Sequence, residues 1–476
     1  MKNNLVFGFA GLCAVAIFGC ESIVKAEKAQ EELAARADDG FAGETGGKID
    51  LTALDLEGLV DYALTNRPQM ATAALSLEDA RLALKAIDAN APLLSDTPWN
   101  AISANGSAGY NESSERSHGL RWAKHGNASA SLSVELLLWD WGRHEAEAKA
   151  QVERILAAEL ALVDEGFAVF SQVSTAYFEV LTADALLEIS QTNELVMAVQ
   201  EERARQRLEA GETQRSDYLQ AKKNLAAAKE QSVVRRDAVK TAGAQLVKVL
   251  GLDASKAARE DVLKPLANPL VSYKRAFADT TGTVDGIFAD ARTNAPNMRI
   301  ARARLRAASR DVDAAKAEFY PTLSLSGSVN WTDPLWMWSW GANLAQNIFS
   351  GFRTETALER AVVAMKAAAA NIDAEEQELS KSLFDAVATR DDAKVAFESA
   401  AVTYEAAKEN YEVVAQQYLV GECNQLDYAD AVNSLVTAMG EMVRNFYSGQ
   451  IAEASIFRLT GEYPVYAGAG EGDREE

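Results

Sequence analysis

The chain has 476 residues, 48% of them hydrophobic, so it is long enough to bury a large core. Its formal net charge of −22 argues against a nucleic-acid-binding protein, because phosphate binding needs a basic surface. The sequence contains no HExxH, GxSxG or phosphate-loop motif, and its three histidines have no metal-ligand spacing, so we expect no enzyme, no metal site and no cofactor.

The first residues carry an export signal. Lys2 supplies the positive charge, and the apolar stretch at 5–18 is too short to span a bilayer. The stretch ends in Gly19-Cys20, which is similar to a bacterial lipobox, although Phe18 stands where a small residue is usual. That similarity implies that Cys20 becomes the lipidated N-terminus; the alternative is an ordinary signal peptide cut nearby.

We therefore expect residues 1–19 to be a lipoprotein signal peptide and the polar, glycine-rich residues 20–50 to be a tether. Glu21, rather than an aspartate, follows the cysteine, which by the sorting rule for lipoproteins implies delivery to the outer membrane. Of the other two cysteines, Cys13 lies in the signal, so Cys423 has no partner for an intrachain disulfide.

An internal repeat begins with a short motif. Residues 63–68 read ALTNRP and residues 291–296 read ARTNAP, and an Asn-x-Pro sequence is typical of a helix entry. Helices rich in Ala, Leu and Arg are expected next, at about 69–90 and 297–318. The sequence thus predicts two copies of one structural unit.

The pattern then changes to strict alternation of apolar and small polar residues. We expect two β-hairpins, at about 101–137 and 322–347, whose strands are about ten residues long, the length and pattern of membrane β-strands. All eight tryptophans lie within or beside these hairpins, and tryptophan favours the membrane interface. A soluble sandwich with tryptophans in its core is the alternative, because serine on the second face suits open solvent as well as a wet lumen.

Two very long helices are expected after the hairpins. From Arg143 to Gly211 and from Arg353 to Gly421 the chain runs 68 positions without a proline, which corresponds to about 100 Å of helix. The first keeps a 4-3 spacing of apolar residues that is typical of a coiled-coil seam. Its members are Leu156, Leu160, Val163, Phe167, Phe170, Tyr177 and Leu181, with Ser174 filling one position.

Each long helix is expected to turn and return as a second helix, at about 216–250 and 426–460. The first repeat then covers residues 51–252 and the second 286–464. Residues 253–285 form a connector between them, and the Gly/Glu-rich residues 465–476 are expected to be a disordered tail.

The two turns share a signature in which Gly, Glu, Asp, Tyr and Ala recur 210 positions apart, within residues 210–221 and 420–431. Gly211 and Gly421 suit helix C-caps. Ser216 is expected to cap the returning helix, with Asp217 and Asp427 in or near the first turns, where the helix dipole favours an anion. A well-made turn with no other function would leave the same pattern.

Taken together, the exported N-terminus, the duplication, the two membrane-type hairpins and the two long helical hairpins resemble the TolC-type outer-membrane efflux factors, in particular their OprM- and NodT-like lipoprotein branch. The resemblance covers about 51–464. It implies a mainly α-helical protein with membrane β-strands, in which a homotrimer closes a 12-stranded β-barrel in outer-membrane lipid above a long periplasmic α-helical barrel. It further implies a passive exit duct that docks onto a periplasmic adaptor protein and an inner-membrane pump in a tripartite system.

The resemblance also implies a periplasmic gate at the turns. Asp427 and Asp430 match the family's constricting aspartates, and three copies would form two carboxylate rings. Tyr418 matches a tyrosine that latches the tip closed through a partner near Ser216 and Asp217. The basic latch residue expected at Cys423 is missing, and Asp430 read alone could simply be a solvated helix residue.

A periplasmic adaptor and a soluble enzyme are the two alternative classes of protein. A lipidated periplasmic adaptor also contains a long helical hairpin, but it needs one hairpin with lipoyl-like β domains, whereas this sequence predicts two hairpins and strands patterned for lipid. A soluble enzyme would leave the helix length and the charge unexplained. The sequence does not identify the transported molecule or the class of pump.

Overall fold

The computed structural model describes residues 26, 28–30, 56–89, 91–92, 105–116, 122–211, 213–252, 284–332, 335–420 and 422–461. The expected signal peptide, Cys20, the tail and nearly all of the tether and connector lie outside the described residues, as does Gly421.

The order of elements repeats once along the chain. The first copy consists of α2 (Leu56–Asn66), α3 (Pro68–Asp88), β1 (Asn105–Arg116), β2 (Trp122–Trp139), α4 (Arg143–Glu209) and α5 (Arg215–Val249). The second consists of α7 (Val284–Asn294), α8 (Pro296–Ala317), β3 (Thr322–Thr332), β4 (Leu335–Ala345), α9 (Arg353–Val420) and α10 (Gln425–Thr460).

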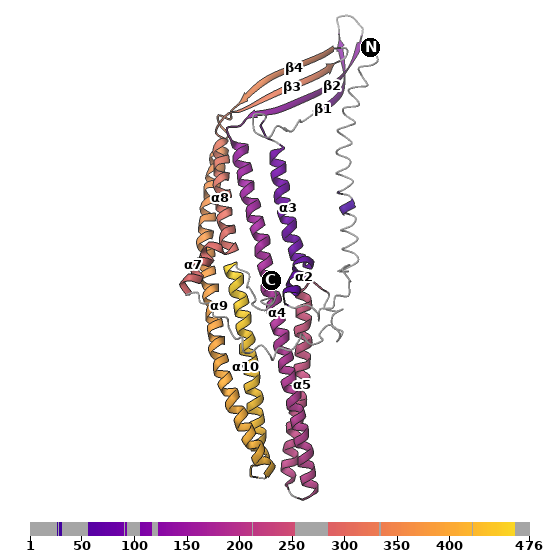
Figure 1. Ribbon diagram of the computed structural model, residues 1–476. Coiled ribbons are helices and arrows are strands. Elements are labelled where there is room, and N and C mark those ends of the chain that lie inside the picture. Colours follow the sequence, from indigo (N-terminus) through magenta and orange to yellow (C-terminus); the bar gives the residue numbers. More distant parts are fainter. Residues whose placement is uncertain are drawn as a thin grey trace, which may run out of the picture.

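Two long helical hairpins dominate the molecule. Helices α4 and α9 contain 67 and 68 residues, about 100 Å each, and they return as α5 and α10. The sheet lies at one end of the helices, and both turns lie together at the opposite end (Figure 1). The helix bounds expected from the sequence for these hairpins are confirmed to within two residues.

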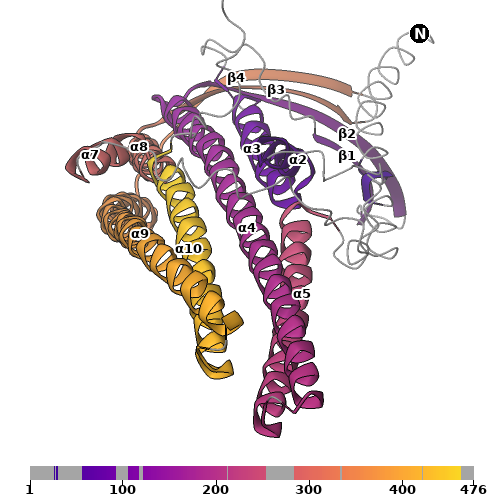
Figure 2. The ribbon, with the colours of Figure 1, turned by 60° about the horizontal axis from the view of Figure 1, so that its bottom comes forward.

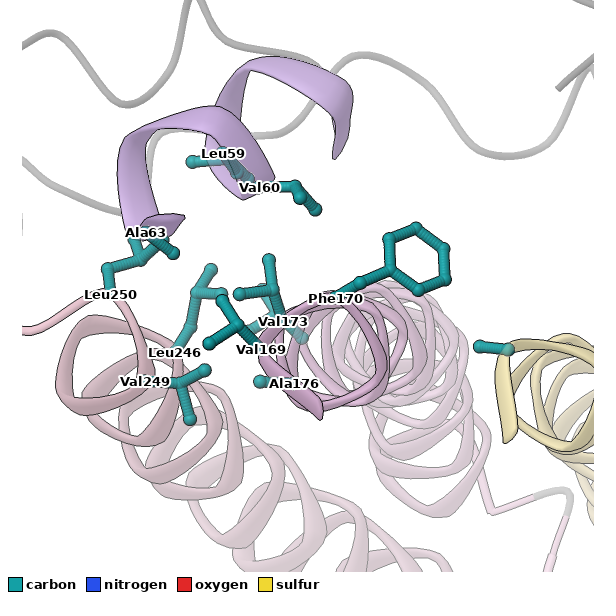
Figure 3. Close-up of a cluster of buried hydrophobic side chains, with 12 residues drawn as sticks. Leu59, Val60, Ala63, Val169, Phe170, Val173, Ala176, Leu246, Val249 and Leu250 are labelled. Carbon is teal, nitrogen blue, oxygen red and sulfur yellow. The ribbon is translucent and has the colours of Figure 1, made fainter. Parts of the chain in front are cut away.

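The coiled-coil seam of α4 is largely buried. All its expected members are buried or half-buried except Val163, which is 46% exposed. Around residues 166–171 every side of α4 is covered, because α2 and α5 pack against it there together with Ala454 of α10. Figure 3 shows this cluster, in which Leu246 of α5 points toward Val169 and Val173 of α4, and α2 with Leu59 lies over them.

A second cluster repeats the first at matched positions. It joins α7, α8, α9 and α10, and its core includes Ala291 and Met298. Residues of the two clusters correspond at a spacing of 210 positions, namely Val169 with Leu379, Val173 with Leu383, and Leu246 with Ile456. The duplication seen in the sequence is therefore a duplication of cores.

The two repeats also pack against each other through α4 and α8. Arg154 binds both carboxylate oxygens of Asp311, at 2.7 and 2.6 Å, and Arg306 donates to Glu153 at 2.8 Å. An apolar cluster that includes Leu160 lies between the same two helices. The two repeats are thus joined along α4 and α8, and α10 of the second hairpin lies beside α4 of the first (Figure 2).

The four strands form one antiparallel sheet in the order β1-β2-β3-β4, so that β2 and β3 join the two repeats. The register places apolar residues opposite apolar ones. Across β3 and β4 the pairs are Leu323 with Leu344, Leu325 with Ala342, Gly327 with Trp340, Val329 with Trp338, and Trp331 with Trp336. The alternate positions of β3 carry small polar residues, and Ser328 hydrogen-bonds Ser339 of β4 at 2.8 Å.

The apolar face is left largely uncovered at the β4 edge. Trp336, Trp338 and Trp340 are 68%, 75% and 74% exposed. The described strands form a single layer (Figure 1), whereas a sandwich would cover this face with a second sheet. The alternative of a soluble sandwich is therefore wrong for the described strands.

Each strand-to-helix junction uses two successive residues with positive φ. They are Trp141 (56°) and Gly142 (80°) before α4, and Gly351 (64°) and Phe352 (64°) before α9. Trp141 stacks on Tyr320 with ring centroids 5.6 Å apart, which favours its strained backbone. Among the described helices, none combines the length and the apolar character needed to cross a bilayer.

Candidate gate at the ends of the helical hairpins

The first turn is closed by hydrogen bonds within its own loop. Gly211, the residue after the Ala210 C-cap of α4, adopts φ 77° and donates its N–H to the Leu208 carbonyl at 3.0 Å, as expected for a glycine that ends a helix. Asp217 lies in the first turn of α5, where its carboxylate accepts a hydrogen bond from the Thr213 hydroxyl at 2.7 Å. The expectation that Ser216 caps α5 is wrong, because α5 begins at Arg215 and Gln214 occupies the N-cap without a side-chain bond.

The second turn has a stronger helix start. The Asn424 side chain accepts from the Asp427 N–H at 2.9 Å, and the Asp427 carboxylate accepts from the Asn424 N–H at 3.3 Å, which makes a capping box. Asp427 therefore stabilises the start of α10, independently of any role in a gate. Asp430, one helical turn further, is exposed like Asp427, so both carboxylates are available to solvent from one side of α10.

A group of tyrosines joins the two helices of the second hairpin. Tyr418 on α9 is 5% exposed, and its hydroxyl donates a short hydrogen bond to the Gln425 side-chain carbonyl at the start of α10. Its ring packs on the Tyr428 ring with centroids 5.0 Å apart, and the Tyr428 hydroxyl lies 3.4 Å from that of Tyr411. The contacts tie α9 to α10 just above the turn.

The same tyrosines pack against the first hairpin. Tyr418 and Tyr428 belong to an apolar cluster with Met197 of α4, Ala228 of α5 and Val432 of α10, which we call the tip cluster. The Arg207 guanidinium lies 5.2 Å from the centre of the Tyr418 ring, in position for a cation–π contact. The two hairpins are therefore held together near their tips by buried aromatic surface.

Burial controls the ionisation of this region. Desolvation raises the pKa of the Tyr418 hydroxyl, opposed by the nearby Arg207 and Arg203, so the phenol stays protonated and can donate to Gln425. Burial also raises the pKa of the Cys423 thiol, which the charge of Asp427 raises further. Cys423 is half-buried, with its Sγ 3.5 Å from the Val414 carbonyl.

The structure brings some of the expected gate residues together and separates others. Tyr418, Asp427 and Asp430 lie at one turn. In the single chain, however, Tyr418 is bonded to Gln425 and Asp217 to Thr213, so the latch between Tyr418 and Asp217 stays a prediction.

Sequence reasoning missed Gln425, Tyr411 and Gln200 as members of this site; the Gln200 side chain contacts the Tyr428 hydroxyl. Tyr428 could have been found, because it recurs with Tyr218 in the repeated signature. Tyr411 and Gln200 lie within long regular helices, where no local pattern marks them.

Comparisons with known proteins agree with this architecture. The family model described as "Outer membrane efflux protein" matches residues 59–252 and 288–462. The chain is 25% identical over 480 residues to the outer membrane protein OprJ of Pseudomonas aeruginosa, a match that covers 96% of this chain and 95% of OprJ. It is 22% identical over 434 residues to the probable outer membrane lipoprotein SilC of Salmonella typhimurium, covering 88% of each.

A solved structure shares the fold. A crystal structure of CusC superposes with a TM-score of 0.72 at 20% identity, and the match covers 86% of this chain and 92% of that one.

Proposed function

The chain belongs to the outer membrane efflux protein family, whose model matches most of its length, and from this premise we propose that it forms the passive exit duct of a tripartite efflux system. It is an outer-membrane efflux protein and not an enzyme. In the proposed assembly, three copies enclose a channel that carries small molecules from the periplasm to the exterior. A gate closes the periplasmic end.

The observation that carries the proposal is the sheet with two free edges. Within the described sheet, β1 and β4 each pair on one side only, and an unpaired strand edge in lipid would leave several backbone groups without hydrogen bonds. Three four-stranded sheets joined edge to edge give twelve strands and leave no edge. The apolar face at β4 then contacts lipid, and the serine face lines a wet lumen.

The helices support the same assembly. The long helix α9 exposes large apolar side chains along its length, among them Phe384 (64%), Val395 (66%) and Val402 (70%). A helix that exposes so much apolar surface is expected to be covered by a neighbour. Contacts between subunits along α9 would turn the pair of hairpins into one third of a hollow helical barrel.

The gate is proposed at the free end of that barrel. Asp427 and Asp430 would form two stacked carboxylate rings around the threefold axis, while Tyr418 and Asp217 help to hold the turns closed. Gly211, with its positive φ, allows the sharp turn of the first hairpin, and we assign Gly421, which lies outside the described residues, to the second turn. A periplasmic adaptor and an inner-membrane pump would engage this end.

We also assign an anchor and the remaining segments. Residues 1–19 are assigned as a lipoprotein signal peptide, 20–50 as the tether, 253–285 as the connector and 465–476 as the tail. Cys20 carries the lipid and holds the chain at the inner face of the outer membrane. Cells fed labelled palmitate should label the wild-type protein and not Cys20→Ala; persistent labelling of the variant would exclude this anchor.

Mass and solubility test the duct itself. The mature protein should need detergent for extraction from outer membranes, and native mass spectrometry of the delipidated protein should give a trimer. A monomer that stays in solution without detergent would contradict the duct and would favour a periplasmic coiled-coil protein.

A further inference from the structure

A cavity lies between the two hairpins, beside the tip cluster, and it shares Tyr418 with the proposed gate. Its volume is about 390 Å³, within the range of small-molecule sites. One wall is formed by Val196 and Val199 of α4, and the other by Tyr411 and Tyr418 of α9 and Tyr428 of α10. An occupant would therefore touch both hairpins at once.

The cavity contains a buried polar atom without a partner. Gln200 of α4 is 2% exposed and lines the cavity, and its side-chain carbonyl oxygen has no hydrogen-bond partner. Buried side-chain oxygens in folded proteins are nearly always paired, because an unpaired one costs about 1–3 kcal/mol. This oxygen is an acceptor, so the missing partner is a hydrogen-bond donor.

The charge at the cavity is positive. Arg203 lies one helical turn from Gln200 on the same face of α4 and also lines the cavity. It forms no ion pair with any carboxylate of the described residues, in contrast to Arg205, which is paired with Glu202 at 2.8 Å. Arg207, on the ring face of Tyr418, adds a second positive charge.

We propose that this cavity is a binding site for a small aromatic carboxylate that also carries a hydroxyl group. The aromatic ring packs between the tyrosines and the valines, the hydroxyl donates to the Gln200 carbonyl oxygen, and the carboxylate pairs with Arg203. Because the walls come from both hairpins, the bound ligand stabilises their contact and opposes separation of the tips. The proposal does not depend on the duct, since it concerns binding alone.

The probe for this site is para-coumarate, titrated calorimetrically into the detergent-solubilised protein with a detergent blank. Wild type should show saturable binding. Gln200→Leu should weaken binding about tenfold, the loss of one buried hydrogen bond, and Arg203→Ala about two- to fivefold, the loss of one exposed ion pair.

Matched controls exist on the same helices. Asn410→Leu changes the exposed residue 210 positions after Gln200, and Arg205→Ala removes an arginine that is already paired; neither should change the affinity. Cinnamate, which lacks the hydroxyl, should bind wild type about tenfold more weakly than para-coumarate, and the two should bind Gln200→Leu equally. The methyl ester of para-coumarate has no carboxylate to pair with Arg203, so Arg203→Ala should not change its affinity.

Three results would overturn the proposal. They are no saturable binding of para-coumarate by wild type, equal binding of para-coumarate and cinnamate by wild type, or unchanged binding by both Gln200→Leu and Arg203→Ala. Arg203 is exposed, so Arg203→Ala should fold normally. If Gln200→Leu does not fold, Arg203→Ala and the comparison of para-coumarate with cinnamate still test the proposal.

Discussion

Gly461, which ends α10, lies directly against Pro296, the first residue of α8: a methyl group on the Gly461 Cα would lie 3.1 Å from the Pro296 Cδ. The first repeat has the same arrangement, with a methyl group on Gly251 lying 3.2 Å from the Asn66 carbonyl oxygen. Both glycines have positive φ, 74° and 80°. The returning helix of each repeat is therefore docked onto the Asn-x-Pro motif that begins the repeat.

Gly461→Ala is expected to destabilise the protein by roughly 1–3 kcal/mol, because alanine is strained at positive φ and its methyl group meets Pro296. Thermal unfolding followed by circular dichroism measures the effect. The matched control is Gly211→Ala, which has φ 77° but nothing within 4 Å of the new methyl group. Equal losses in the two variants would show that the contact with Pro296 contributes nothing.

The sequence predicts the large elements well because their signals are periodic and long. The proline-free interval from Arg143 and the equal spacing of the two halves fix helix lengths to within two residues. The contact between Gly461 and Pro296 was not predictable from the sequence. A glycine that ends a helix and a proline that begins one are each explained by their own helix, so neither indicates the other. Only the structure shows that a C-cap and a helix entry 165 positions apart in the sequence share one contact.

Leu325→Arg should impair assembly far more than Ser326→Arg. Leu325 lies on the apolar face of β3, opposite Ala342, whereas Ser326 lies on the polar face, opposite Gly341. A charge on a lipid-facing position costs roughly 2–4 kcal/mol at the middle of the bilayer. The yield of trimer in purified outer membranes is the measurement, and equal yields of the two variants would indicate a sheet that does not face lipid.

Cys423 should react slowly with a thiol reagent at neutral pH, and its rate should rise with pH through a pKa above that of a free cysteine. Burial raises the pKa of this thiol, so less of it is present as the reactive thiolate. The control is Glu422→Cys in a Cys423→Ser background, because position 422 is exposed in the same turn. Modification of both thiols at the same rate at neutral pH would contradict the packing against Val414.

The candidate gate was less predictable than the fold. The sequence indicates Tyr418, Asp427 and Asp430 through a resemblance, and it does not show what they contact. Ser216 is a good capping residue, but the cap position falls on Gln214, because the helix start is set by the turn as a whole. The Gln425 partner of Tyr418 is seven positions away across the turn, and their contact depends on the conformation of that turn. The position of the buried Gln200 depends on the crossing of helices that are distant in sequence, which no local pattern encodes.

The central claim is a channel whose periplasmic end is lined by Asp427 and Asp430. The structure decides which substitution should test it: Asp427 holds a capping box, so Asp427→Ala would damage the turn, whereas Asp427→Asn keeps an acceptor oxygen and removes the charge. The test variant is therefore Asp427→Asn with Asp430→Asn. Glu441→Gln, an exposed carboxylate further along α10, is the matched control.

Single-channel recording of the full trimer in a planar bilayer under a salt gradient is the most direct measurement. Wild type and Glu441→Gln should conduct, favour cations and be blocked by a trivalent cation added to the periplasmic side, because a carboxylate ring attracts cations. The double variant should conduct without cation selectivity and without the block. Trimers that insert but do not conduct would contradict the duct, and unchanged selectivity and block in the double variant would remove Asp427 and Asp430 from the gate.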